Sequence, residues 1–118
     1  MKMEFIVAVL IMIVADVITG FLKALKAGNI KSAVMKEGLL SKVSEIVVMV
    51  LMYIIDIGAP VLGVNINLPL CQVVGLYICI MELASVIENI GTINPTLSKK
   101  LANIFQDFTK DKGEEEDE

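Results

Sequence analysis

Three long apolar stretches, separated by segments that contain polar residues, glycine and proline, make up most of the chain. They cover residues 5–25, 43–61 and 70–90, and Gly28-Asn29 and Gly91 follow the first and the third. Each stretch has about 20 residues, the length that an α-helix needs to cross a hydrocarbon layer of ~30 Å. We therefore predict three transmembrane helices at residues 5–25, 43–61 and 70–90, which together form a membrane domain of residues 1–91.

The segments outside these stretches have other patterns. Residues 30–42 read as a short connection, with room for a helical piece against the headgroups. Asn94 followed by Pro95 is typical of a helix start, because asparagine caps the first turn and proline fits the first helical position. An amphipathic helix within residues 92–112 is predicted, too polar to span and lying on the membrane surface or on the protein itself. Residues 113–118 are predicted to be a disordered acidic tail. The apolar stripe of the amphipathic helix consists of Leu97, Leu101, Ile104, Phe105 and Phe108.

Composition supports an all-α membrane protein. Of the 118 residues, 56% are hydrophobic but only 5% are aromatic, so Ile, Val, Leu, Met and Ala supply the apolar mass. A soluble domain of this length leaves too much of its area in contact with water to hide so many apolar side chains. The net charge of −4 owes much to the tail, whose last five residues are all acidic. Nucleic-acid binding is not expected, because the chain has no basic stripe with interleaved aromatic residues.

The residue types also limit the chemistry. The chain has no histidine and two cysteines, Cys71 and Cys79. We therefore expect no zinc site, no histidine-based triad, no cofactor and no enzymatic activity. The two cysteines are eight residues apart, which is ~12 Å along one helix and too far for a disulfide within it. Whether they form disulfides between subunits stays open.

Acidic residues inside the apolar stretches are the main candidates for function. Asp16, Asp56 and Glu82 each lie in one predicted helix, and a charge at the bilayer centre costs roughly 2.5–3.5 kcal/mol. The lysines lie near one edge of the spans, so a monomer is expected to lack a midplane base. We therefore predict that the acids face an assembly surface or an aqueous lesion of a homo-oligomer. The alternative is a static bundle in which they make helix–helix hydrogen bonds. Residues at helical spacing extend the predicted pore or assembly face to Asp16, Thr19, Gly20, Lys23, Asp56, Glu82, Ser85 and Asn89.

A second, inner-boundary cluster is predicted from Lys23, Lys42, Glu45 and Glu88, with separate solvated charges as the alternative. Orientation follows from the lysines, which gather in the first connection and the C-terminal part, while the opposite side has only Lys2. Because cytoplasmic segments carry the excess of lysine, the N-terminus is predicted outside and the C-terminus in the cytoplasm.

The ordered set of these residues resembles the phage holins of the toxin-secretion/phage-lysis type. The resemblance covers nearly the whole chain; one departure is the short, uncharged second connection, which can be longer in relatives. The residues that carry it are the run Asp16-Val-Ile-Thr-Gly-Phe-Leu-Lys-Ala-Leu-Lys-Ala-Gly-Asn-Ile-Lys-Ser32, then Gly38-Leu39-Leu40, Lys42 and Asp56, then Glu82, Ser85, Glu88, Asn89 and Gly91, and finally Pro95 and Leu97.

The resemblance implies a non-enzymatic protein that oligomerises in the bacterial cytoplasmic membrane. Holins open lesions that release an endolysin, causing host cell lysis, or in some relatives a protein toxin, and an antiholin is a possible partner. Two other hypotheses remain open. One is a small ion or proton channel, or a transporter subunit, that uses Asp16, Asp56 and Glu82 as relay groups. The other is a non-conducting membrane anchor for a cytoplasmic partner.

Overall fold

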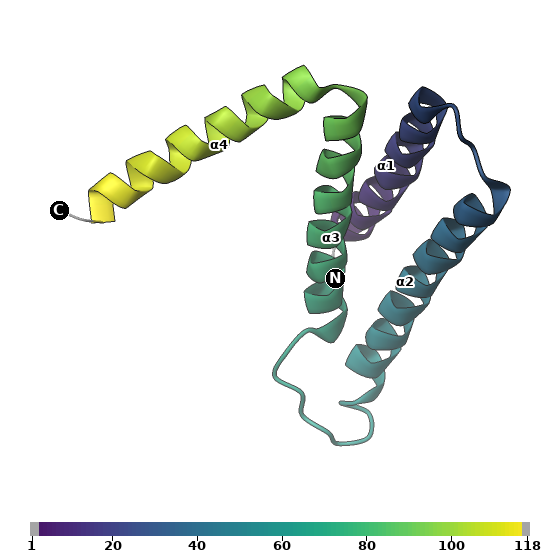
Figure 1. Ribbon diagram of the computed structural model, residues 1–118. Helices are drawn as coiled ribbons and strands as arrows, with labels where there is room; N and C mark the ends of the chain where they lie inside the picture. Colours follow the sequence, from purple (N-terminus) through teal and green to yellow (C-terminus); the bar gives the residue numbers. More distant parts are fainter. Residues whose placement is uncertain (1–2, 117–118) are drawn as a thin grey trace.

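The computed structural model describes residues 3–116, which form four α-helices and no β-strand within that range (Figure 1). Three of these helices are long and apolar enough to cross a membrane. The predicted all-α architecture, with three spanning helices followed by a more polar one, is confirmed. The helices are α1 (Met3–Ala27), α2 (Ser32–Gly58), α3 (Leu70–Ile93) and α4 (Pro95–Glu116).

Helix α2 differs most from the sequence prediction, because it begins at Ser32 instead of residue 43. Lys31 has an extended backbone just before it, and from Ser32 to Ile57 the chain has no proline and one glycine, Gly38. One interior glycine costs a helix only about 1 kcal/mol, so the helix continues through it. The predicted connection at residues 30–42 is therefore mostly the first part of α2. Lys42 consequently lies well inside a spanning helix.

The C-terminal helix also extends further than expected. Its start agrees with the prediction, since the Asn94 side-chain oxygen accepts a hydrogen bond from the backbone N–H of Leu97 at 3.2 Å. Its end lies at Glu116, beyond Gly113, where the acidic tail was predicted to begin. Glutamate is a good helix former, which accounts for continuation through this segment. Asp117 and Glu118 lie outside the described residues.

Helix α3 packs against both α1 and α2, whereas α1 and α2 touch each other little. Close packing occurs around Gly75 of α3, where an added Cβ atom would lie 2.6 Å from the Phe5 ring and 3.2 Å from the Met49 methyl group. A glycine thus lets all three helices approach closely, as small residues do in membrane bundles. The buried apolar core consists of Val9, Ile13, Met49, Cys71 and Ile78.

Both ends of α3 are bonded to the other spanning helices. At its start, the Asp56 carboxylate of α2 accepts hydrogen bonds from the backbone N–H groups of Leu70 at 3.0 Å and Cys71 at 2.8 Å. At its end, the Lys26 ammonium of α1 donates to the carbonyls of Thr92 at 3.0 Å and Ile93 at 2.8 Å. An anion at the N-terminus and a cation at the C-terminus both complement the helix dipole.

The outer surface of the three spanning helices is apolar. Large side chains such as Ile11, Leu76 and Tyr77 are each more than half exposed. A hydrocarbon solvent satisfies this surface, whereas contiguous apolar patches of this extent are rare on soluble monomers. The exposed surface and the helix lengths therefore agree that α1, α2 and α3 lie in a membrane.

Candidate membrane-embedded polar site

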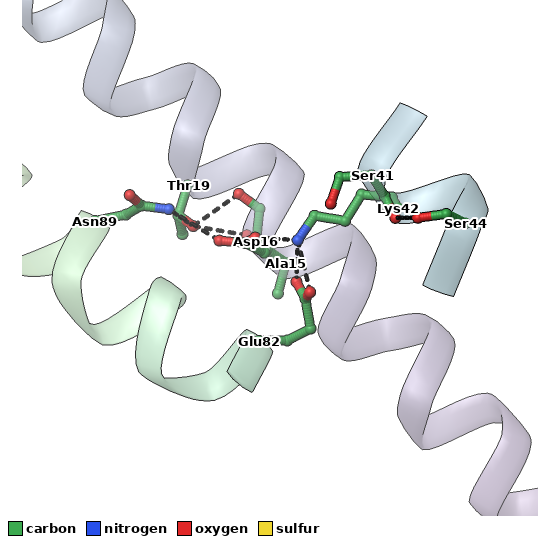
Figure 2. Close-up of polar contacts among 8 residues, drawn as sticks. All are labelled: Ala15, Asp16, Thr19, Ser41, Lys42, Ser44, Glu82 and Asn89. Carbon is green, nitrogen blue, oxygen red and sulfur yellow. Dashed lines mark hydrogen bonds and ion pairs between the residues drawn. The ribbon is translucent and has the colours of Figure 1, made fainter. Parts of the chain in front are cut away.

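A lysine from α2 joins two acids from the neighbouring helices inside the bundle (Figure 2). The Lys42 ammonium donates to Asp16 Oδ2 of α1 at 2.5 Å. It also donates to both carboxylate oxygens of Glu82 of α3, at 2.6 Å and 2.5 Å. Asp16 and Glu82 lie close to the middle of their helices, and Lys42 lies three residues before the middle of α2. A network of one ammonium and two carboxylates, each from a different helix, therefore occupies the central layer of the bundle.

An amide and a hydroxyl extend this network toward the α1–α2 connection. The Asn89 side-chain amide of α3 donates to Asp16 Oδ1 and to Thr19 Oγ1, both at 3.1 Å. Thr19 in turn donates to the Ala15 carbonyl at 2.8 Å (Figure 2). Asp16 thus receives an ammonium on one oxygen and an amide on the other. We call Asp16, Lys42, Glu82 and Asn89 the Lys42 cluster.

The Lys42 cluster is buried from solvent even though all its members are polar. The side chains of Lys42, Asp16 and Glu82 retain 16%, 9% and 3% of their exposure. Pairing is what makes such burial tolerable, because an isolated charge at the bilayer centre costs roughly 2.5–3.5 kcal/mol. With both acids ionised, the two carboxylates exceed the single ammonium by one negative charge. Because the paired groups come from three different helices, the cluster is stable only while these helices stay together.

Glu45 adds a further carboxyl group close to this layer. It lies three residues after Lys42, on the next turn of α2, and it interacts electrostatically with Glu82. Its Oε2 atom is buried and has no hydrogen-bond partner among the described side chains. An unpaired buried oxygen is costly, so Glu45 makes this part of the bundle less stable than the paired groups suggest.

A groove of about 540 Å³ opens between α1 and α2, on the side of the cluster nearer the α1–α2 connection. Asp16, Lys42, Ser85 and Asn89 contribute its polar lining, while Val17, Phe21, Val34 and Leu39 are among its apolar lining residues. The groove exists because α1 and α2 make little contact with each other. Polar groups at the centre of the bundle are thus reached from its surface along this groove.

A family model described as the bacteriophage holin family matches residues 2–110, nearly the whole chain. The chain belongs to the bacteriophage holin family. Neither the curated proteins nor the solved structures contain a significant match. Roles in lysis and pore formation follow from the family. Together with the three spanning helices, membership makes the chain a multi-pass protein of the cytoplasmic membrane, in a family that is not one of enzymes.

In this holin-family chain, the structure brings together four residues of the predicted pore or assembly face: Asp16, Thr19, Glu82 and Asn89. Gly20 and Ser85 also line the groove beside them.

Asp56 is separated from this group. It lies two residues before the end of α2, bonded to the start of α3, and so is not near the middle of its span. Lys23 is half-buried on α1 and takes part in none of these bonds. Involvement of these residues in a pore stays a prediction.

The four residues of the predicted inner-boundary cluster are not joined into one network among the described side chains. Lys42 pairs with Asp16 and Glu82 instead, and Glu88 is exposed. The expectation that a monomer lacks a midplane base is wrong for the same reason. One sequence signal could have placed Lys42 inside the second spanning helix. Apart from one glycine, no helix breaker lies between residue 32 and the second apolar stretch.

The remaining candidate chemistry is limited. Within residues 3–116, no group of three or more His, Cys, Asp or Glu side chains is arranged to hold a metal ion. Both cysteines are free thiols; Cys71 belongs to the buried core, and Cys79 is half-buried beside it. The site is thus one of ion pairs and hydrogen bonds between helices.

Proposed function

We propose that this holin-family protein assembles into homo-oligomers in the bacterial cytoplasmic membrane and forms lesions that release an endolysin or a protein toxin. The observation that carries the proposal is the Lys42 cluster, which places paired charges in the central layer of a bundle of only three spanning helices. A protein that first accumulates harmlessly and later permeabilises the membrane needs polar groups that are paired in one packing and wetted in another. The cluster supplies such groups.

The geometry supports a closed monomer. Lys42 holds α2 to both other helices in the central layer, although α1 and α2 otherwise touch each other little. If α2 moves away, Asp16 and Glu82 lose their cation and must find water or another chain, because lipid cannot solvate them. Exchange of these intramolecular pairs for contacts between chains around water is the step that we propose converts stored protein into a lesion.

The orientation that we propose places the N-terminus outside and the C-terminus in the cytoplasm. Lys26, Lys31, Lys99 and Lys100 lie on or near the side that carries the α1–α2 connection and the start of α4. The α2–α3 connection, residues 59–69, has no charged residue. The positive-inside rule then favours the lysine-rich side as cytoplasmic, where an endolysin or toxin would wait.

Release of solutes of graded size tests the proposal. Vesicles that contain the purified protein would be loaded with a small dye and a folded fluorescent protein. We expect both to escape together after a lag that shortens as protein density in the membrane rises. Loss of the dye without the fluorescent protein at every density would contradict lesion formation.

A small ion or proton channel is the second candidate. The observation that favours it is the excess of carboxylates over lysine in the central layer, with Glu45 close to Glu82. Such a channel would dissipate a proton or cation gradient at low protein density while retaining both the dye and the fluorescent protein. The same vesicles, with a pH-sensitive dye inside, therefore distinguish the two functions.

A further inference from the structure

Hydrogen bonds at the corner between α3 and α4 fix where α4 begins. A single residue, Asn94, separates the two helices. Its N–H donates to the Ile90 carbonyl at 2.7 Å, its carbonyl accepts from Ser98 N at 3.2 Å, and its side chain caps Leu97 N. Because Asn94 uses its N–H, its carbonyl and its side-chain oxygen in these bonds, α4 starts directly at the end of the spanning helix α3. Figure 1 shows α4 leaving the bundle at a steep angle to α3.

The face of α4 that meets α3 is the face that carries the apolar stripe. Ser98 lies against Gly91 of α3, with its Oγ 3.1 Å from the position of an added Cβ, and Leu101 is half-buried. Ile104 and Phe105 follow Leu101 by three and four residues, so they continue the same side of the helix. They are 63% and 62% exposed, because α4 has left α3 behind by then. The stripe therefore faces back toward the level of the spanning helices.

The opposite face of α4 is polar and includes two lysines. Lys99, Gln106 and Lys110 lie roughly half a turn away from the centre of the stripe. An interfacial helix has this arrangement, with apolar side chains buried ~5–10 Å below the headgroups and lysines among the lipid phosphates. A bilayer that solvates the exposed apolar side chains of α3 would also extend beneath the stripe.

We infer that α4 docks on the surface of the same bilayer that α1–α3 span, with Ile104 and Phe105 inserted below the headgroups. The occupant of this apolar face is lipid, because the covalent corner holds the helix at the boundary and the stripe faces the hydrocarbon. The inference needs only a membrane-inserted chain and does not depend on lesion formation. It gives α4 a defined place, lying along the bilayer surface and not projecting into the aqueous phase.

A fluorescence experiment on the full chain tests the inference, because the natural sequence has no tryptophan. The Phe105→Trp variant places a reporter on the stripe, and the Gln106→Trp variant places one on the polar face as a matched control. Both would be reconstituted in vesicles of phosphatidylcholine and phosphatidylglycerol, with and without lipid brominated near the carboxyl end of its chains. Far-UV circular dichroism would verify that both variants keep the helical content of the natural chain.

Brominated lipid should quench the Phe105→Trp variant several-fold more than the Gln106→Trp variant, and aqueous iodide should show the reverse order. Equal quenching of the two variants would overturn the docking. If brominated lipid quenches Phe105→Trp only after the protein is diluted in lipid, then a second copy of the chain covers the stripe. That result would also overturn the docking of α4 on the bilayer. Vesicles that show the docking pattern but release no solute would contradict the lesion proposal alone, so the two failures are separable.

Discussion

The two halves of the three-helix bundle are held together by different side chains. Toward the α2–α3 connection, the Phe5 ring, the Met49 methyl group and Gly75 pack so closely that no Cβ fits between them. Toward the α1–α2 connection, Lys42 bridges Asp16 and Glu82 beside an open groove of about 540 Å³. We call these the apolar half and the charged half. Dispersion and shape hold the first, whereas ion pairs hold the second.

The difference matters in a membrane. Apolar contacts between helices compete with equally apolar lipid, so the apolar half depends on close packing. The pairs of the charged half have no alternative partner in lipid, so they resist separation until water or another chain arrives. A bundle of this kind has one half that keeps its shape and one half that can exchange its partners. The proposed lesion uses the second half.

Removal of the cation from the charged half should give the largest effect. Lys42→Met leaves Asp16 and Glu82 buried without their ammonium, and breaking a buried pair in this way destabilises proteins by about 3–5 kcal/mol. We expect a loss of this size in the free energy of unfolding, measured by circular dichroism in mild detergent with increasing dodecyl sulfate. In vesicles, we expect the lag before solute release to shorten.

Two further variants control this experiment. Lys36→Met removes an exposed lysine from the same helix and should change stability little. Combining Lys42→Met with Asp16→Asn and Glu82→Gln removes the whole ion pair and should recover most of the loss, because no unpaired charge remains. If Lys42→Met unfolds like Lys36→Met, the charged half does not hold the bundle.

The apolar half is tested by Gly75→Ala. The new methyl group would lie 2.6 Å from the Phe5 ring and 3.2 Å from the Met49 methyl, so the Phe5 ring or the helices must shift. Overpacking of this kind costs about 1–3 kcal/mol in the same unfolding measurement. Gly38→Ala is the matched control, since nothing lies within 4 Å of its added Cβ. It should stabilise α2 by roughly 0.5–1 kcal/mol, and a loss similar to that of Gly75→Ala would refute the packing argument.

The cap at the start of α3 should have a smaller effect. Asp56→Ala removes the acceptor for the N–H groups of Leu70 and Cys71, and loss of such a cap costs about 1 kcal/mol. Asp56→Asn keeps one acceptor oxygen and should retain much of the stability. A large change in solute release by Asp56→Asn, without a change in stability, would instead favour the predicted place of Asp56 on an assembly face.

Hydropathy was sufficient to predict the number of spanning helices, because apolar length and breakers determine where a chain can cross a membrane. It was not sufficient to predict the start of α2. Residues 32–42 include Lys36, Glu37 and Lys42, and polar residues next to an apolar stretch read equally well as a loop or as a helical extension. That choice decided the position of Lys42, and with it the pairing in the central layer.

The candidate site was predicted by residue but not by partner. Helical spacing placed Asp16 with Thr19, and Glu82 with Asn89; in the structure, the Asn89 amide of α3 donates to both Asp16 and Thr19 of α1. Contacts between different helices depend on how the helices rotate and approach, which periodicity within one helix does not contain. For this reason Asp56 was grouped with Asp16, although it caps α3 at the other end.

The smallest predicted effect concerns the amide at the edge of the charged half. Asn89→Leu removes the donor to Asp16 and Thr19 but leaves the Lys42 pairs in place. Interhelical hydrogen bonds in membranes contribute about 0.6 kcal/mol on average, so we expect a loss of that order. A double-mutant cycle with Thr19→Val measures the Asn89–Thr19 bond separately. If Asn89→Leu costs as much as Lys42→Met, then the amide and not the ammonium is the main link between the helices, and the division into an apolar and a charged half must be redrawn around Asn89.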